Sequence, residues 1–189
     1  MQKTTQSTIH KLVTCALLTA MGVILGGMLS IPAFPLGMYS VKIGFGVLPV
    51  ILAGVLYGPV YGGMVGGLTD LIQALLFPKG AYVPWFTIVG IFFGLIPGLF
   101  FRKKEKPTFL RLLAAIACGQ TFGSIICNTL LMILLYGSSI SAILPLRIAN
   151  QAVMIPLYTT LVYAMIPILQ KAGVAKERLQ PLEAKRSIE

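Results

Sequence analysis

The sequence has few charged side chains, and acidic ones are the scarcest. Only 11% of its 189 residues are charged, with 15 Lys or Arg against five Asp or Glu, whereas 57% are hydrophobic. The mean hydropathy is +0.89. Soluble domains carry about a quarter of their residues as charges. The composition therefore excludes a soluble globular domain and indicates an integral membrane protein, with room for roughly six helices of about 20 residues each.

Histidine, cysteine and paired acids are also scarce, which removes most catalytic and metal-binding arrangements. His10 is the only histidine, so neither a histidine cluster for zinc nor a Ser-His-Asp relay can be assembled. Cys15, Cys118 and Cys127 lie in apolar segments without metal-ligand spacing, and we interpret them as buried small side chains. No ATP-binding fingerprint is present. We expect no enzymatic activity, no metal, and no cofactor bound directly by the chain.

Apolar stretches of membrane-spanning length are abundant. We predict an all-α integral membrane protein whose six transmembrane helices lie at about residues 9–30, 43–57, 60–77, 84–101, 109–136 and 142–169. One membrane domain is expected over residues 1–170, followed by a charged cytoplasmic tail over 171–189. Residues 31–42 contain two prolines and a glycine, so we expect a loop or a re-entrant segment shielded by protein there.

Small residues recur at intervals of four, a spacing that lets membrane helices approach closely. In the second and third segments the pattern predicts a tightly packed helical hairpin, and the fourth segment repeats it; the glycines are Gly54, Gly58, Gly62, Gly66, Gly90, Gly94 and Gly98. On the first segment, Ala16 and Ala20 have the same spacing. They either pack inside the same bundle or form a docking surface for another membrane subunit.

The basic residues are divided unevenly between the two sides that six spans would create. Twelve of the 15 belong to the N-terminus, to residues 102–111 or to the tail, all on one side. The positive-inside rule makes this side cytoplasmic and places both termini there. The exceptions on the outer half are Lys42, Lys79 and Arg147. They can converge on one vestibule and attract an anion, although snorkelling to lipid headgroups is the alternative for the two lysines.

Other polar and aromatic residues accompany these cations. Asn150 and Gln151 follow Arg147 on the last segment, where polar side chains usually face the protein interior. Asp70, a lone acid within the predicted spans, either ties to an outer cation or accepts hydrogen bonds from a ligand amino group. The stretch 77–85 includes Tyr82 and Trp85, which form either an interfacial aromatic belt or a lid and stacking platform for a planar ligand.

Several blocks resemble the substrate-binding S components of energy-coupling factor (ECF) vitamin transporters. Residues 48–63, 66–70 and 77–82 carry the family resemblance, and LPLRIANQ at 144–151 with 154–156 is most similar to the folate-specific branch. The resemblance implies a multi-pass cell-membrane protein that captures vitamin from outside. It also implies delivery through a transmembrane T component powered by two ABC-type ATPases, which use ATP. Ala16 and Ala20 match the family's Ala-x-x-x-Ala docking motif.

Folate, the ligand that this resemblance implies, combines a flat pterin, an aryl ring and a dicarboxylate tail. Such a ligand requires aromatic faces, an amide or carboxylate partner, and cations. We expect the anionic part at Arg147, Lys79 and Lys42. Ring contacts are expected from Trp85, Tyr82, Phe34 and Tyr39. The pterin edge is expected at Asn150, Gln151 or Asp70.

Besides a folate-binding component, two alternatives stay open at this point. The ligand can be another vitamin or precursor, such as hydroxymethylpyrimidine or pantothenate. The other alternative is a self-sufficient secondary carrier or a membrane enzyme, although the scarcity of intramembrane acids counts against the carrier. Nucleic acid is not expected as a partner despite the net charge of +10, because the charge follows the membrane topology.

Overall fold

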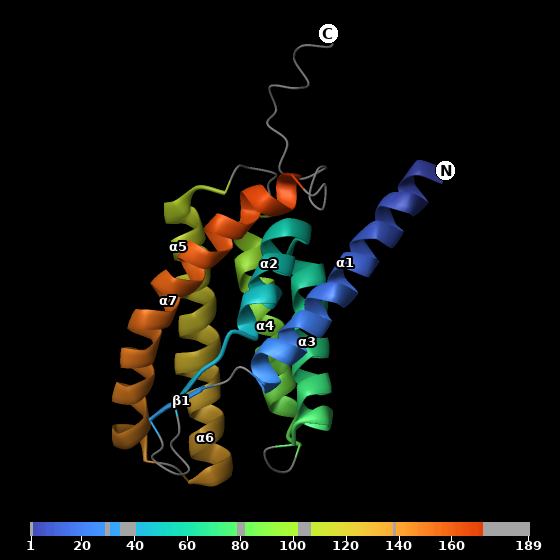
Figure 1. Cartoon of the computed structure of the whole chain (residues 1–189). Helices are drawn as coiled ribbons and strands as arrows, with labels where there is room; N and C mark the ends of the chain where they lie inside the picture. Colours follow the sequence, from blue (N-terminus) through green and yellow to red (C-terminus); the bar gives the residue numbers. More distant parts are fainter. Residues whose placement is uncertain are drawn as a thin grey trace.

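The computed structural model describes residues 2–28, 31–34, 41–78, 82–101, 107–137 and 139–171, and almost all of them are helical (Figure 1). The helices are α1 (Gln2–Gly27), α2 (Val47–Tyr57), α3 (Pro59–Leu76), α4 (Pro84–Phe100), α5 (Phe109–Gln120), the π-helix η2 (Thr121–Cys127), α6 (Asn128–Tyr136) and α7 (Ile140–Lys171). Because α5, η2 and α6 are continuous, each of the six predicted segments corresponds to one helical stretch. The helical architecture is confirmed.

Three stretches of the described chain are long and apolar enough to cross a membrane: Thr8–Gly27, Phe109–Leu135 and Ile143–Leu169. The apolar helices α2 and α4 are shorter. With 11 residues, α2 extends for about 16 Å, roughly half of the hydrocarbon thickness of a bilayer. It is shorter than we expected because the preceding residues, predicted as helix, form a strand and a turn instead.

The strand belongs to a two-stranded sheet that the sequence did not reveal. Strand β1 (Ile31–Phe34) pairs antiparallel with β2 (Val41–Ile43), and Ile31 lies opposite Ile43. The register shifts between Pro32 and Phe34, where a proline without an N–H is tolerated at a sheet edge. The expected loop or re-entrant segment is therefore a strand pair in its described part, and the all-α prediction needs this one correction. Strand β2 packs against α7.

Helices α2, α3 and α4 pack with their backbones in direct contact. A Cβ added at Gly54 or Gly62 would collide with the carbonyl oxygen of Gly94, and one at Gly66 would collide with that of Gly90. A Cβ at Gly62 would also lie 2.6 Å from Cα of Gly54, which confirms the predicted tight hairpin of α2 and α3, and the repeated pattern in α4 belongs to the same contact. These glycines join the three helices into one closely packed unit.

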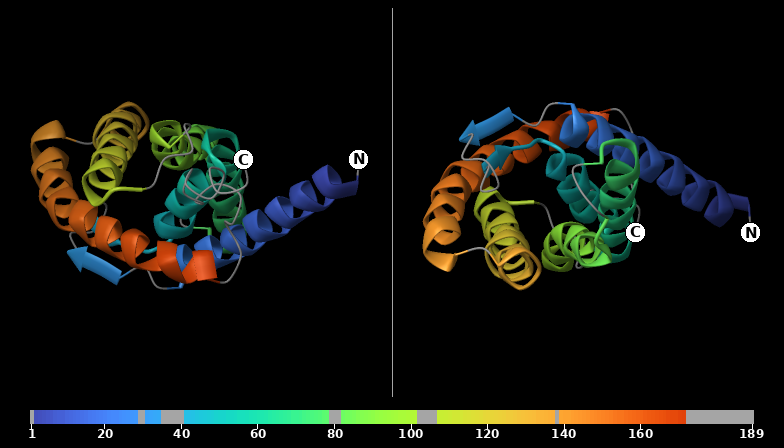
Figure 2. Two further views of the ribbon diagram at one scale, coloured as in Figure 1. Left: turned by 90° about the horizontal axis from the view of Figure 1, so that it is seen from above. Right: turned by 90° about the horizontal axis from the view of Figure 1, so that it is seen from below.

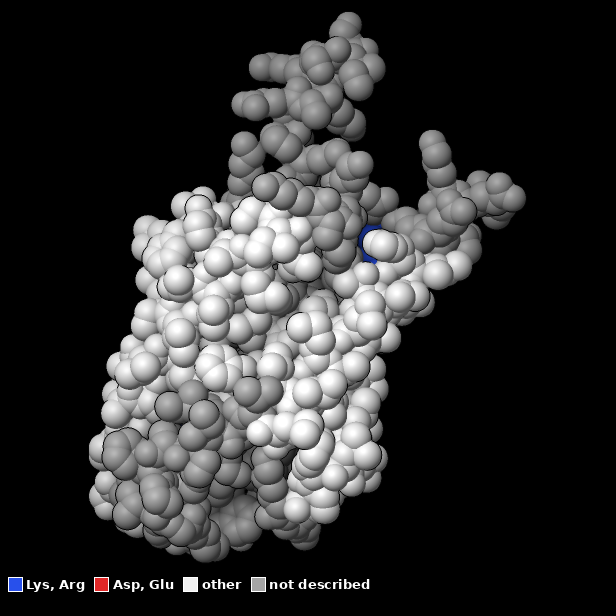
Figure 3. All heavy atoms as spheres, viewed as in Figure 1, with Lys and Arg blue, Asp and Glu red and all other residues white. Residues whose placement is uncertain are grey.

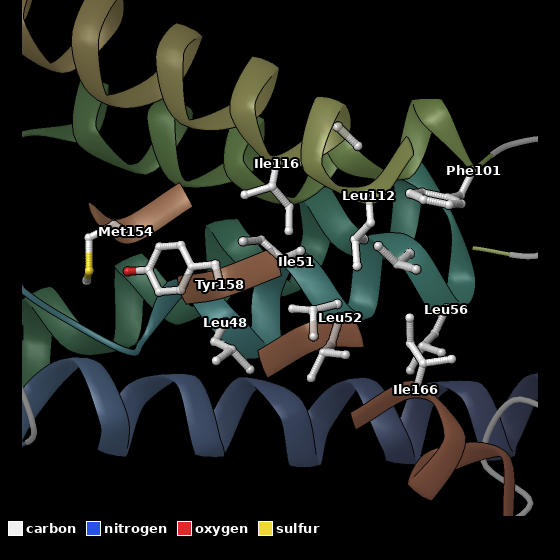
Figure 4. Packing of buried hydrophobic residues seen from close by; sticks show 13 residues of the cluster. Leu48, Ile51, Leu52, Leu56, Phe101, Leu112, Ile116, Met154, Tyr158 and Ile166 are labelled. Carbon is white, nitrogen blue, oxygen red and sulfur yellow. The ribbon is translucent and has the colours of Figure 1, made fainter. Parts of the chain in front are cut away.

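The main apolar core joins α2 to α5 and α7 (Figure 4). Leu52 and Leu56 of α2 meet Leu112 of α5 and Ile166 of α7 in this cluster. Every α2 residue from 48 to 56 is buried, so the short helix is enclosed by protein. By contrast, α1 runs along one side of the bundle and extends away from it (Figure 2), touching mainly α2 and α3.

Helix α1 begins and α7 ends at one end of the bundle, whereas β1, the ends of α3 and α6 and the starts of α4 and α7 lie at the other, which we call the loop end (Figure 1). The described surface in Figure 3 is almost free of charged side chains, as expected of helices that face lipid.

The expectation that all three cysteines are buried is wrong. Cys15 is buried, but Cys127 is only half-buried and Cys118 is exposed. Cys118 lies within a stretch long enough to cross a membrane, and an uncharged thiol there can face hydrocarbon because it behaves as a small apolar group.

Candidate functional site

Asp70 is held between α3 and α4 by a chain of hydroxyl groups near the loop end. Thr87 Oγ1 donates a hydrogen bond to Oδ2 of Asp70 at 2.8 Å, and the phenol of Tyr82 lies 2.9 Å from the same hydroxyl. Since Thr87 uses its only proton on Asp70, the Tyr82 O–H is the donor to Thr87. A Cβ at Gly90 would lie 3.0 Å from the Cβ of Asp70. The carboxylate therefore lies in a tight helix interface with a hydroxyl partner.

Only part of the predicted ligand site, with its cations and ring contacts, falls within the described residues. Lys79 and Tyr39 lie outside them, and for Phe34 and Lys42 only the backbone is described, in β1 and β2. The remaining cation, Arg147, forms no ion pair with Asp70 in the described part of the chain, and its guanidinium donates to η2. Contact between Asp70 and a ligand stays a prediction.

Arg147 crosses from α7 to the π-helix η2. Its Nη1 donates to the carbonyl oxygen of Ser124 at 3.0 Å, and the hydroxyl of Thr129 reaches the same oxygen at 3.4 Å. The π-helix changes the backbone pairing at this point, a feature that often marks functional sites. A guanidinium has five N–H donors, so the group can still bind an anion bidentately. The residues thus position a half-buried cation beside an irregular turn.

One turn further along α7, Gln151 meets Gln120 at the end of α5. Nε2 of Gln151 lies 3.4 Å from Oε1 of Gln120, and the two side chains are 6% and 3% exposed. Gln151 Oε1 and Gln120 Nε2 have no hydrogen-bond partner in the described part of the chain. Gln151 was among the predicted site residues, but Gln120 was not. An amide inside a membrane-length apolar run was the signal that could have found it.

These two contacts form one line, which we call the polar seam: Arg147 with Ser124, and Gln151 with Gln120. The two pairs are four residues apart along α7 and four residues apart, in the opposite direction, along the α5–η2 stretch, as two antiparallel helices require. Farther from the loop end the same face of α7 becomes apolar, and Met154 and Tyr158 join the main core. The phenol of Tyr158 donates to the carbonyl of Gly44, which ties α7 to the end of the strand pair.

The remaining candidates are distributed around the loop end. Asn150 is half-buried on α7. Tyr82 is 44% exposed, and Trp85, at the start of α4, is 59% exposed, as in an interfacial aromatic belt. Nothing in the described contacts joins Trp85 to the polar seam, so its stacking role stays a prediction.

Ala16 and Ala20 are both exposed on α1. Packing inside the bundle, the first of the two interpretations, therefore does not apply to them. That role falls to Gly22 and Gly26, whose added Cβ atoms would meet Thr69 and Gln73 of α3. The docking interpretation remains a prediction.

Known proteins resemble this chain over most of its length. The family "ECF transporter, substrate-specific component" matches residues 10–166. The folate transporter FolT of Clostridium novyi (strain NT) is 29% identical over 123 residues, which cover 65% of this chain and 71% of the relative. The crystal structure of FolT bound with folic acid aligns with a TM-score of 0.68 at 26% identity, covering 80% of this chain and 88% of that one.

A second solved structure supports the fold alone. It is the S component of a bacterial ECF transporter, with a TM-score of 0.65 at 23% identity, and the alignment covers 85% of this chain and 97% of that chain.

Proposed function

The chain belongs to the family of substrate-specific components of ECF transporters, and from this premise we propose that it binds folate outside the cell for import. Membership makes it a membrane-integral transport protein and not an enzyme. Such a component works with a transmembrane T component and with ATPases, which supply the energy. Folate is proposed because the relative is a folate transporter and the solved structure at 26% identity is bound with folic acid.

We propose six membrane spans with the loop end outside and both termini in the cytoplasm. In support, twelve of the 15 basic residues belong to the opposite side, and α1 begins where α7 ends. The short α2 does not conflict with this topology, because it is enclosed by protein. Residues 1–170 would form the substrate-binding domain, and 171–189 a cytoplasmic tail.

Arg147 carries the proposal for an anionic ligand. A half-buried guanidinium within a membrane span is costly without a counter-charge. In the described chain Arg147 donates to the uncharged carbonyl of Ser124. A carboxylate of folate supplies that charge and accepts two parallel hydrogen bonds. A cationic vitamin such as thiamine would be repelled. Lys42 and Lys79 would add positive charge at the outer rim.

The remaining candidates keep the roles that folate chemistry requires. Ring contacts would come from Phe34, Tyr39, Tyr82 and Trp85. Polar contacts to the pterin edge would come from Asn150, Gln151 or Asp70. Ala16 and Ala20, exposed on α1, would dock on the T component.

The test compares Arg147→Ala with Arg111→Ala by equilibrium folate binding to the purified protein. Arg111 is the matched control, because it lies at the start of α5, 5.6 Å from the ring of Phe101 and far from the loop end. Removing one partner of a buried charged pair costs about 2–5 kcal/mol, which weakens binding by about 30-fold or more. We expect this loss for Arg147→Ala only. Equal folate affinity of the two variants would contradict the assignment.

A further inference from the structure

We propose that Gln120 is a ligand-contacting residue that acts with Gln151 to read the heterocyclic edge of the substrate. This inference rests on the proposed function and adds a residue and a recognition mode to it. The pair would bind a planar edge in which a hydrogen-bond acceptor stands beside a donor. The pterin of folate has such an edge, and its benzoyl-glutamate part does not.

The two amides have unused hydrogen-bonding capacity. Both side chains are more than nine-tenths buried, and each leaves one polar atom without a partner in the described chain. Their mutual contact of 3.4 Å is long for an N–H···O bond. A purely structural amide pair would satisfy both groups, because buried polar atoms are costly to leave unpaired. The arrangement is therefore incomplete without a third molecule.

The unpaired donor and acceptor remain whichever way the two amide groups are oriented. One hydrogen bond between two amides always uses one nitrogen and one oxygen. If oxygen and nitrogen are exchanged in both Gln120 and Gln151, the free atoms are Gln120 Oε1 and Gln151 Nε2 in place of Gln120 Nε2 and Gln151 Oε1. In both cases the pair presents one free donor and one free acceptor. An edge of opposite pattern satisfies them together.

Along the polar seam, the two amides lie deeper in the bundle than Arg147. Gln151 lies four residues after Arg147, and Gln120 four residues before Ser124, which places the amides about 6 Å farther from the loop end than the guanidinium. A ligand entering from the loop end would thus meet the cation first and the amides last. Its ring system would enter ahead of its anionic tail.

The test uses methionine, which keeps the shape of glutamine and removes its hydrogen bonds. The probes are folate and p-aminobenzoyl-glutamate, which lacks the pterin, titrated against wild type, Gln120→Met and Gln151→Met. We expect each variant to lose at least tenfold in folate affinity and to keep its affinity for the fragment. We also expect the melting temperature of the ligand-free protein to change little, because each replacement removes one unpaired atom and unpairs one atom of the remaining amide, so that the number of unpaired atoms stays the same.

Gln73→Met is the matched control, because Nε2 of Gln73 donates a hydrogen bond to the carbonyl oxygen of Gly22 at 2.9 Å. It should lower the melting temperature and leave folate affinity unchanged. Unchanged folate affinity in Gln120→Met would overturn the inference and leave the proposed function intact. A lower melting temperature with parallel losses for folate and the fragment would assign a structural role and overturn it as well. Wild-type protein that binds no folate would refute the proposed function, and this inference with it.

Discussion

Replacing Gly94 by alanine should separate two helices that touch through their backbones. The added Cβ would collide with the carbonyl group of Gly62 on α3, and no side-chain rotation can relieve that contact. Overpacking costs about 1–3 kcal/mol, and the upper value applies because backbone must move. For a chain of this size, about 3 kcal/mol corresponds to a melting temperature about 6–12 °C lower.

Gly63 provides the matched control on the facing helix. A Cβ there would lie 3.2 Å from Cγ2 of Ile91, a side chain that can shift, and alanine gains about 1 kcal/mol in helix preference over glycine. We expect Gly63→Ala to change the melting temperature little. The assay is thermal unfolding of both variants in the same detergent. A Gly94→Ala variant as stable as Gly63→Ala would refute the backbone-contact reasoning.

Two further predictions concern Asp70 and the docking surface. Thr87→Val removes the donor to Asp70 and should lower the free energy of unfolding by about 1.5–3 kcal/mol. The control is Thr160→Val, which removes a hydroxyl that bonds on an exposed face and should change the free energy of unfolding little. Equal effects of the two variants in denaturation experiments would contradict a stabilising role of Thr87 toward Asp70. Ala16→Trp and Ala20→Trp should abolish folate uptake by cells while sparing folate binding by the purified protein. Ile168→Trp, at a position 65% exposed on α7, is the control, and loss of binding in the Ala16 or Ala20 variant would argue against a docking role.

The helical segments could be predicted because hydrophobic length is a local signal. Each apolar run ends at a proline, glycine or charged stretch, and each predicted segment corresponds to one helical stretch within a few residues, apart from the starts of α1 and α2. The strands could not be predicted, because β1 has four residues and one is a proline. Its pairing with β2 depends on residues seven or more positions away.

For the candidate site, the sequence indicated which residues stand out but not which residues they contact. Arg147 and Gln151 stand out as polar residues in an apolar run, but their contacts with Ser124 and Gln120 span 23 and 31 residues. Those contacts depend on the antiparallel register of α7 against α5 and η2, which no local pattern specifies. The π-helix is likewise invisible in the sequence TFGSIIC, although it sets the carbonyl that Arg147 contacts.

The central claim is tested most directly by calorimetric titration of folate into the purified wild-type protein, without ATP or partner subunits. The account predicts saturable binding of one folate per chain, and stabilisation against heat by about 2.7 kcal/mol at a folate concentration 100 times the Kd. Thiamine should produce neither effect. Binding of thiamine or pantothenate in place of folate would contradict the account.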